Sequence, residues 1–246
     1  MTRWKFISAA FLLIAAPASA AEAPVRIMMP AYTQVALAAL KPMIEARTGV
    51  IIDLEPTTTD AIVERLAKGE AGDLVLASKG PLSAPAVVER LASQQDIAVS
   101  TVGIGVPDGA PKPKLLTADD LSAFFKAVPS FAYSTNQSGR HIASVFDKLG
   151  LTDVMKAKSQ TGGGLMGALV LKGEVAAAGQ QISELRLAGL KNIVPLPEPY
   201  QIRIIVTAGV PKTARNAAGA QKVTAFLASG DAANVYENSG LMPVSK

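Results

Sequence analysis

Residues 25–54 read VRIMMPAYTQVALAALKPMIEARTGVIIDL, and this stretch indicates the class of fold. Its two ends, residues 25–29 and 50–54, are short apolar runs typical of buried strands. Between them, residues 32–47 form a helical pattern that Pro42 interrupts or kinks, with Gly49 just past its end. A strand, a helix and a second strand in this order predict a parallel βαβ unit.

The same alternation continues toward the C-terminus. The patterns predict further strands over 73–77, 99–106, 130–133, 175–180 and 202–208. They predict helices over 59–68, 84–92, 140–149 and 181–187, one that Thr117 caps, and one that the glycines at 162–164 open. A helical tail follows at 217–229 and 232–238. Two such units predict a mixed α/β protein with two lobes, whose tail returns to the first lobe.

The first residues of the chain have the three parts of a secretory signal peptide. Arg3 and Lys5 precede an uncharged apolar run over 6–16, Pro17 breaks that run, and residues 18–20 (ASA) are small, as cleavage requires. The run is shorter than the ~20 apolar residues of a membrane span. We therefore predict a signal peptide over 1–20, cleaved between Ala20 and Ala21, and a mature protein outside the cytoplasm.

Charge and composition exclude several classes of function. Without Arg3 and Lys5 the chain has 22 Lys and Arg against 20 Asp and Glu, a net charge of +2. This weak, scattered charge argues against nucleic acid as a partner and is compatible with a small anionic ligand. The absence of cysteine and the presence of a single histidine, His141, argue against a zinc or other transition-metal site. The sequence also lacks phosphate-binding and dinucleotide-binding loops, so we expect no metal and no cofactor.

Polar residues gather at the predicted turns from strand to helix, where ligands of open α/β sheets bind. Arg140 is the most informative of them, because a cation at a predicted helix start opposes the helix dipole and needs a bound anion or a surface ion pair to explain it. Helix capping and a packed histidine are the competing explanations for the hydroxyls and for His141. The ligand-binding candidates are Tyr32, Thr33, Thr58, Thr59, Ser78, Lys79, Ser138, Arg140, His141, Gly163 and Gln180.

Several segments in order resemble the molybdate-binding-protein-like branch of type II periplasmic solute-binding proteins. They are the opening stretch, IVERLAKGEAGDLVLAS, SGRHIASVFDKLGL, LVLKGEVAAAGQQISEL and AFLASGDAANVYENSGLMPV, and together they cover nearly the whole mature chain. The resemblance implies a periplasmic protein with two α/β lobes and a ligand cleft between them. It implies crossing strands near 102–105 and 205–208, and hence one lobe over 21–103 with 207–246 and the other over 104–206.

The resemblance leaves three functions open. Lys79, Arg140 and His141 are more cations than a tetrahedral oxyanion needs, so binding of an organic di- or tricarboxylate is the first hypothesis. The branch also includes an aconitate isomerase, an enzyme without cofactor, and His141 is then the candidate base. The third hypothesis is transport of molybdate or tungstate. The resemblance further implies a monomer that hands its ligand to the membrane permease of an ABC transporter.

Overall fold

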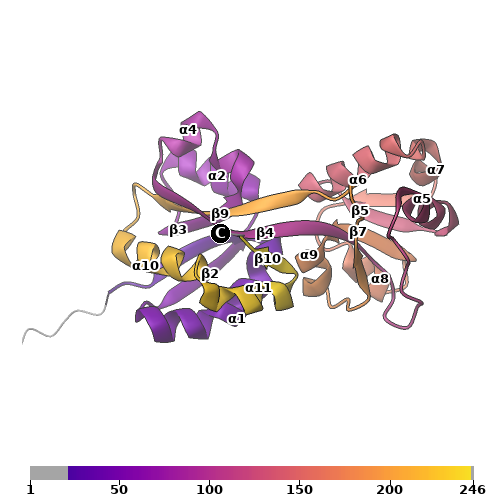
Figure 1. Ribbon diagram of the computed structural model, residues 1–246. Helices are drawn as coiled ribbons and strands as arrows, with labels where there is room; N and C mark the ends of the chain where they lie inside the picture. Colours follow the sequence, from indigo (N-terminus) through magenta and orange to yellow (C-terminus); the bar gives the residue numbers. More distant parts are fainter. Residues whose placement is uncertain (1–21, 245–246) are drawn as a thin grey trace, which may run out of the picture.

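The computed structural model describes residues 22–244, and the predicted signal peptide lies outside them. It shows a mixed α/β protein with two lobes (Figure 1). The sheet of the first lobe contains β1 (Val25–Pro30), β2 (Ile52–Thr57), β3 (Leu74–Ser78), β9 (Arg203–Pro211), β10 (Leu241–Pro243) and the first part of β4 (Leu91–Gly105). That of the second contains the end of β4 with β5 (Phe131–Ser134), β6 (Ser159–Gly162), β7 (Ala177–Gln181) and β8 (Ile193–Pro195).

The first lobe is built on the predicted βαβ pattern. β1 pairs in parallel with β2 and β3, and β9 lies on the other side of β3 in antiparallel orientation. Successive side chains of β1 point to opposite faces. Ile27 packs with the helices on one face, and Met28 packs with Ile62 on the other. Both faces of the sheet are therefore covered by helices.

The helices of the first lobe follow its strands and its C-terminal tail. The tail returns to this lobe as predicted, because Val223 and Tyr236 belong to the same core as Ile27. Pro42 lies within one continuous helix rather than interrupting it. The helices are α1 (Ala31–Thr48), α2 (Thr59–Lys68), α3 (Lys79–Leu82), α4 (Pro85–Val88), α10 (Ala217–Leu227) and α11 (Ala233–Ser239), with a 3-10 turn, η1 (Gly230–Ala232), before α11.

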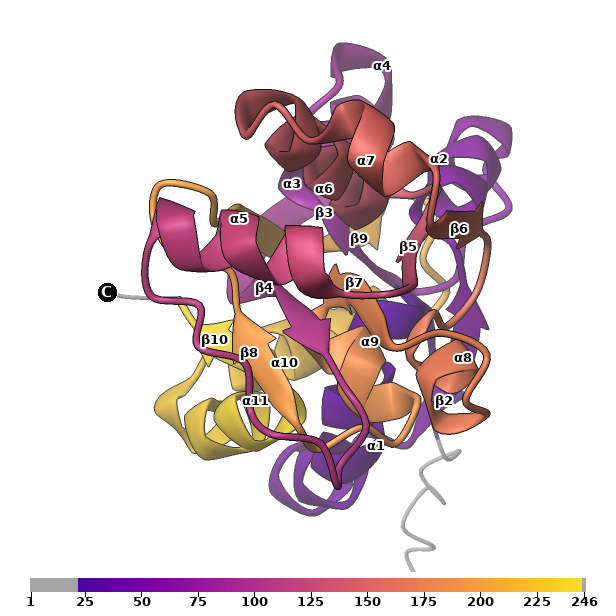
Figure 2. The same cartoon turned by 90° about the vertical axis from the view of Figure 1, so that its right-hand side faces the viewer.

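The second lobe repeats the arrangement around a parallel trio, with β5 between β6 and β7. Figure 2 looks onto this lobe, with α5–α7 on one side of its strands and α8 and α9 on the other. Phe125, Phe131 and Phe146 pack edge to face in its core. Its helices are α5 (Ala118–Ala127), α6 (Gln137–Lys148), α7 (Thr152–Lys156), α8 (Gly167–Leu171) and α9 (Ile182–Leu187).

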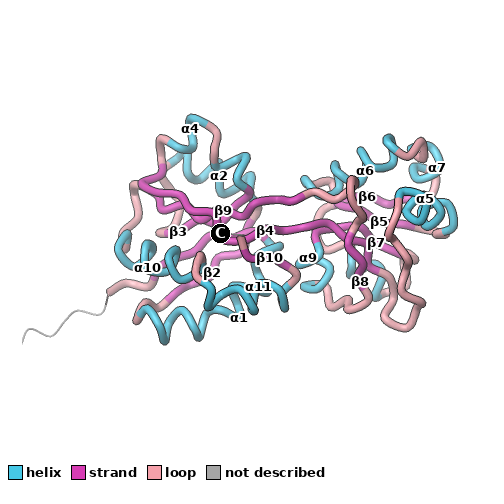
Figure 3. Tube along the Cα trace, in the orientation of Figure 1, coloured by secondary structure: helices cyan, strands magenta, loops and turns pink. Residues whose placement is uncertain are grey.

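β4 and β9 connect the lobes, as the long strands in Figure 3 show. β4 pairs with β9 up to Thr101 and with β7 from Val102 onward. The exchange of partners lies just before the predicted lobe limit at residue 103; the limits 21–103 with 207–246 and 104–206 stay a proposal. The predicted helix over 84–92 is wrong in its second half, because β4 begins at Leu91. Pairing with β9 overrides the helical propensity of those residues.

Two other predicted segments differ in detail. α6 begins at Gln137 rather than at Arg140, because Gly139 lets the first turn press against β5. A Cβ atom at Gly139 would lie 1.5 Å from the carbonyl oxygen of Ser134. Gly162 ends β6 rather than opening a helix, and α8 begins only at Gly167. Among the residues that the structure describes, no helix is long and apolar enough to cross a bilayer.

Candidate functional site

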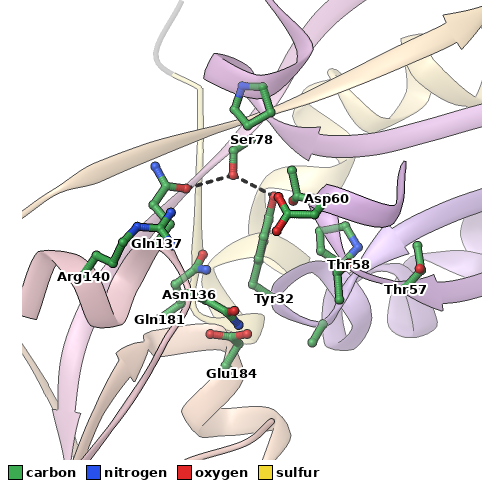
Figure 4. A pocket seen from close by; sticks show the side chains of 14 residues that line it. Tyr32, Thr57, Thr58, Asp60, Ser78, Asn136, Gln137, Arg140, Gln181 and Glu184 are labelled. Carbon is green, nitrogen blue, oxygen red and sulfur yellow. Dashed lines mark hydrogen bonds between the residues drawn. The ribbon is translucent and has the colours of Figure 1, made fainter. Parts of the chain in front are cut away.

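A cavity of about 320 Å³ lies where turns from the two lobes meet (Figure 4). Five strand-to-helix turns form it, after β1, β2 and β3 in the first lobe and after β5 and β7 in the second. This is the position at which open α/β sheets bind ligands, outside the carboxyl ends of their strands. The lining residues are Pro30, Ala31, Tyr32, Thr57, Thr58, Thr59, Asp60, Ser78, Pro81, Asn136, Gln137, Arg140, Gln181 and Glu184.

A chain of hydrogen bonds crosses this cavity from one lobe to the other. The hydroxyl of Ser78 donates to Oε1 of Gln137 at 3.1 Å, so its oxygen accepts from the Tyr32 hydroxyl, also at 3.1 Å. Burial raises the pKa of Tyr32 to about 12, which keeps its phenol protonated at neutral pH. Ser78 therefore links the turn after β1 to the turn after β5.

Five predicted ligand-binding residues line the cavity: Tyr32, Thr58, Thr59, Ser78 and Arg140. Thr58 also caps α2, because its hydroxyl accepts from the backbone N–H of Ala61 at 3.1 Å. Arg140 is exposed and donates from Nη1 to the carbonyl of Thr135 at 3.2 Å, which leaves its other guanidinium donors available to a ligand. These residues give the cavity one cation and several hydroxyl groups.

The other two predicted cations lie elsewhere. Lys79 is paired with Asp96, with 2.7 Å between Nζ and Oδ2. Nε2 of His141 lies 2.7 Å from the carbonyl oxygen of Tyr200. Neither side chain lines the cavity. A hydrogen bond to the backbone accounts for His141, as the packed-histidine explanation anticipated.

Four further candidates also lie outside the lining, each for a local reason. The hydroxyl of Thr33 donates to the carbonyl of Pro30 at 2.8 Å. Ser138 is buried against Ser134, with 3.3 Å between their hydroxyl oxygens. Gln180 accepts from the N–H of Met166 and donates to a carbonyl in the glycine loop after β6. Gly163 is exposed in that same loop.

Sequence reasoning missed the turn between β7 and α9, which contributes Gln181 and Glu184. The strand and the helix were both predicted, so the polar letters QQISE at their junction were a usable signal. Glu184 is 5% exposed, and its Oε2 has no hydrogen-bond partner. Oε1 of Gln181 is also buried without a partner. Two buried oxygen atoms at one cavity thus lack the partners that buried polar atoms usually have.

Burial raises the pKa of Glu184 to about 7, against the opposing effect of hydrogen bonds from the Gln181 backbone and the Gln180 side chain. At neutral pH both the protonated and the ionised form of the Glu184 side chain are therefore populated. A carboxyl group in this condition can donate a hydrogen bond, accept one, or transfer a proton.

α9 reaches the first lobe although it follows a strand of the second. Nη1 of Arg186 donates to the carbonyl of Glu237 in α11 at 3.0 Å and also to the carbonyl of Asn238. A Cβ atom at Gly240, just after α11, would lie 2.9 Å from Ile182. This contact between lobes holds Glu184 at the cavity wall that Tyr32 also lines.

Within residues 22–244, no group of three or more His, Cys, Asp or Glu side chains is placed to hold a metal ion.

Comparison with known proteins agrees with this architecture. Residues 25–242 match the family described as bacterial extracellular solute-binding protein. The chain belongs to this family. The solute-binding protein is also 30% identical over 213 residues to an aconitate isomerase from a Pseudomonas species, a match that covers 82% of this chain and 81% of the relative.

Solved structures share the fold of this solute-binding protein. The periplasmic molybdate-binding protein of Azotobacter vinelandii superposes with a TM-score of 0.74 and 13% identity, over 90% of this chain and all (100%) of that one. PEB3 bound to L-phospholactate superposes with a TM-score of 0.64 and 15% identity, over 89% of this chain and 99% of that one. At these identities the likeness establishes the two-lobed fold alone.

Proposed function

We propose that this solute-binding protein binds a small organic di- or tricarboxylate in the cavity between its lobes. The observation that carries the proposal is the combination of Arg140 with two carboxyl groups, Asp60 and Glu184, on one cavity. A guanidinium suits a carboxylate because it offers two parallel N–H donors. The two acidic groups would repel a compact dianion such as molybdate, whereas an extended ligand can keep its own charges away from them.

The size of the cavity supports an organic ligand. Its volume of about 320 Å³ falls at the lower end of the range that small-molecule sites occupy, roughly 300–1,000 Å³. We propose that the mature protein is a periplasmic monomer that passes its ligand to an ABC permease. The predicted signal peptide over 1–20 and the membership of an extracellular family support this location.

Titration calorimetry on residues 21–246 tests the proposal, with trans-aconitate, cis-aconitate, succinate, molybdate and tungstate as ligands. We expect the carboxylates to bind and the metal oxyanions to bind far more weakly. Thermal unfolding gives a second readout, because a ligand at 100 times its dissociation constant adds about 2.7 kcal/mol to the free energy of unfolding. Tight binding of molybdate with none of the carboxylates would contradict the proposal.

Isomerisation of aconitate is the second candidate function. The Pseudomonas relative named aconitate isomerase supports it. The reaction itself needs only proton transfer along an allylic system. His141 was the base that the sequence suggested, and its hydrogen bond to the Tyr200 carbonyl outside the cavity lining removes the support for that role. Incubation with trans-aconitate, followed by NMR, measures the reaction; absence of the cis isomer after hours would contradict it.

A further inference from the structure

Glu184 differs from the other buried or half-buried carboxylates of the protein. Asp73 accepts hydrogen bonds from three backbone N–H groups, and Asp96 accepts from Lys79 and Thr207. Glu184 is as well buried as Asp73, at 5% and 7% exposed, yet its Oε2 has no partner. Burying a polar atom without a partner costs free energy that the fold does not recover. Glu184 therefore lines the cavity with a carboxyl group whose Oε2 no other residue holds, and a function at this position would explain that cost.

Glu184 forms part of the cavity wall contributed by the second lobe. Figure 4 shows its carboxyl group, in that view, between the side that carries Arg140 and the side that carries Asp60. A ligand whose carboxylate is held by Arg140 would extend past Glu184 toward the hydroxyl groups of the second turn. Its middle carbons, rather than its charged ends, would then lie beside Glu184.

We propose that Glu184 moves the proton when an unsaturated tricarboxylate is isomerised in this cavity, an assignment that rests on the isomerase function proposed above as the second candidate. The Glu184 carboxylate removes a proton from the methylene carbon, so that a C–H bond breaks and an O–H bond forms. The electron pair spreads over the allylic carbons and the adjoining carboxylate. Glu184 then returns the proton to the formerly vinylic carbon, a C–H bond forms and the double bond moves by one position.

A second residue of the cavity has a complementary task in this reaction. Arg140 holds a carboxylate of the ligand and stabilises the negative charge that develops on it. The proton removed is the proton returned, so the balanced step needs no oxidant, reductant or metal. A carboxyl group with a pKa near 7 is suited to both halves of the transfer.

The test compares wild-type protein with Glu184→Gln, Glu184→Asp and a surface control, Glu174→Gln. Glu174 is exposed and is not among the lining residues, and its substitution also removes one carboxylate. Binding of trans-aconitate is measured by calorimetry and its conversion to the cis isomer by NMR. We expect Glu184→Gln to bind within about threefold of wild type and to lose about a hundredfold or more of the isomerisation rate. Glu184→Asp keeps measurable turnover, and Glu174→Gln matches wild type.

The wild-type rate as a function of pH is a second measurement that does not depend on the variants folding. The other ionisable groups lining the cavity are Tyr32 from α1, Asp60 from α2 and Arg140 from α6. The rate should rise with pH through about 7, because only the ionised Glu184 accepts the first proton.

Each result supports or overturns the assignment. Isomerisation retained in Glu184→Gln, or a rate that is flat between about pH 5.5 and 8.5, overturns the role of Glu184 and leaves the isomerase function standing. Binding of trans-aconitate by wild type without any isomerisation overturns the role of Glu184 and leaves carboxylate binding standing. Failure of wild type to bind any carboxylate removes the proposed function and this inference together.

Discussion

The ammonium group of Lys79 lies 2.7 Å from Oδ2 of Asp96, and the other oxygen of that carboxylate accepts a hydrogen bond from Thr207 at 2.7 Å. Lys79 follows β3 directly, but its partner belongs to β4, one of the two strands that connect the lobes. Partial burial raises the pKa of Asp96, but the hydrogen bonds from Lys79 and Thr207 outweigh it and hold the pKa below its ordinary value. A predicted ligand cation is thus part of a structural ion pair.

Substitution Lys79→Ala should change ligand affinity less than about threefold and lower the free energy of unfolding by about 1 kcal/mol or less at pH 7, since the lysine is half-exposed. A group with a depressed pKa contributes stability above its unfolded pKa and loses it as pH falls through the folded one. The difference between variant and wild type should therefore shrink below about pH 4. Urea unfolding at several pH values measures this difference. A large loss of ligand affinity in Lys79→Ala would show that Lys79 contributes to the binding site.

Arg140→Ala should weaken carboxylate binding by about tenfold to a hundredfold, because a hydrogen-bonded charge is lost. Its stability should change by less than about 0.5 kcal/mol, since the side chain is exposed. Arg140→Lys keeps the charge but loses the planar pair of N–H donors, so its affinity should lie between those of wild type and Arg140→Ala. Lys148→Ala, an exposed cation at the end of the same helix, is the matched control in calorimetry. Equal losses in both alanine variants would point to a general charge effect.

Glu184→Gln should make ligand-free stability less dependent on pH. Folding raises the pKa of Glu184 from 4.5 to about 7, so its stability contribution is complete below the unfolded pKa and declines as pH rises through the folded one. The shift corresponds to about 3 kcal/mol. Between pH 5 and 8, wild type should lose more of its free energy of unfolding than the variant does. Urea unfolding at each pH measures this free energy. An equal change with pH in the two proteins would show that Glu184 is not buried as described.

Gly139→Ala should destabilise the protein by about 3 kcal/mol or more, because the added carbon would collide with the Ser134 carbonyl at 1.5 Å. Gly163→Ala is the control, since no atom lies within 4 Å of a Cβ there. Because Gly163 lies outside the cavity lining, this control should also leave ligand affinity unchanged. Thermal unfolding measures the first effect; a stable Gly139→Ala protein would show that β5 and α6 can separate.

Arg186→Ala should loosen the contact between α9 and α11, at a cost of about 1 kcal/mol. Hydrogen exchange of the α11 amides should quicken, because Arg186 bonds to the carbonyls of Glu237 and Asn238 at the end of that helix. Arg47→Ala serves for comparison, since Arg47 makes only an exposed ion pair with Asp231. Unchanged exchange in α11 would mean that the packing of Ile182 suffices to hold the lobes together.

The fold was largely predictable because its signals are local. Apolar runs separated by helical patterns identified the βαβ units, and glycines such as Gly49 marked helix ends, as its φ of 68° confirms. Prediction failed where pairing between distant segments decided the outcome. The helical pattern was predicted to run to residue 92, yet Leu91 pairs with Pro211 of β9, more than a hundred positions later in the chain. No local pattern carries that information.

The candidate site divides in the same way. The sequence by itself determined which turns bear polar side chains, because local patterns identify strand ends and helix starts. Thr58 and Ser78 lie at two of these positions. Only the tertiary structure decided where each side chain points. It pairs Lys79 with Asp96 and His141 with a backbone carbonyl, and it leaves Glu184 buried beside the cavity without a partner for one oxygen. Burial and pairing depend on neighbours distant in sequence, and these set both the charge of the cavity and the pKa of Glu184.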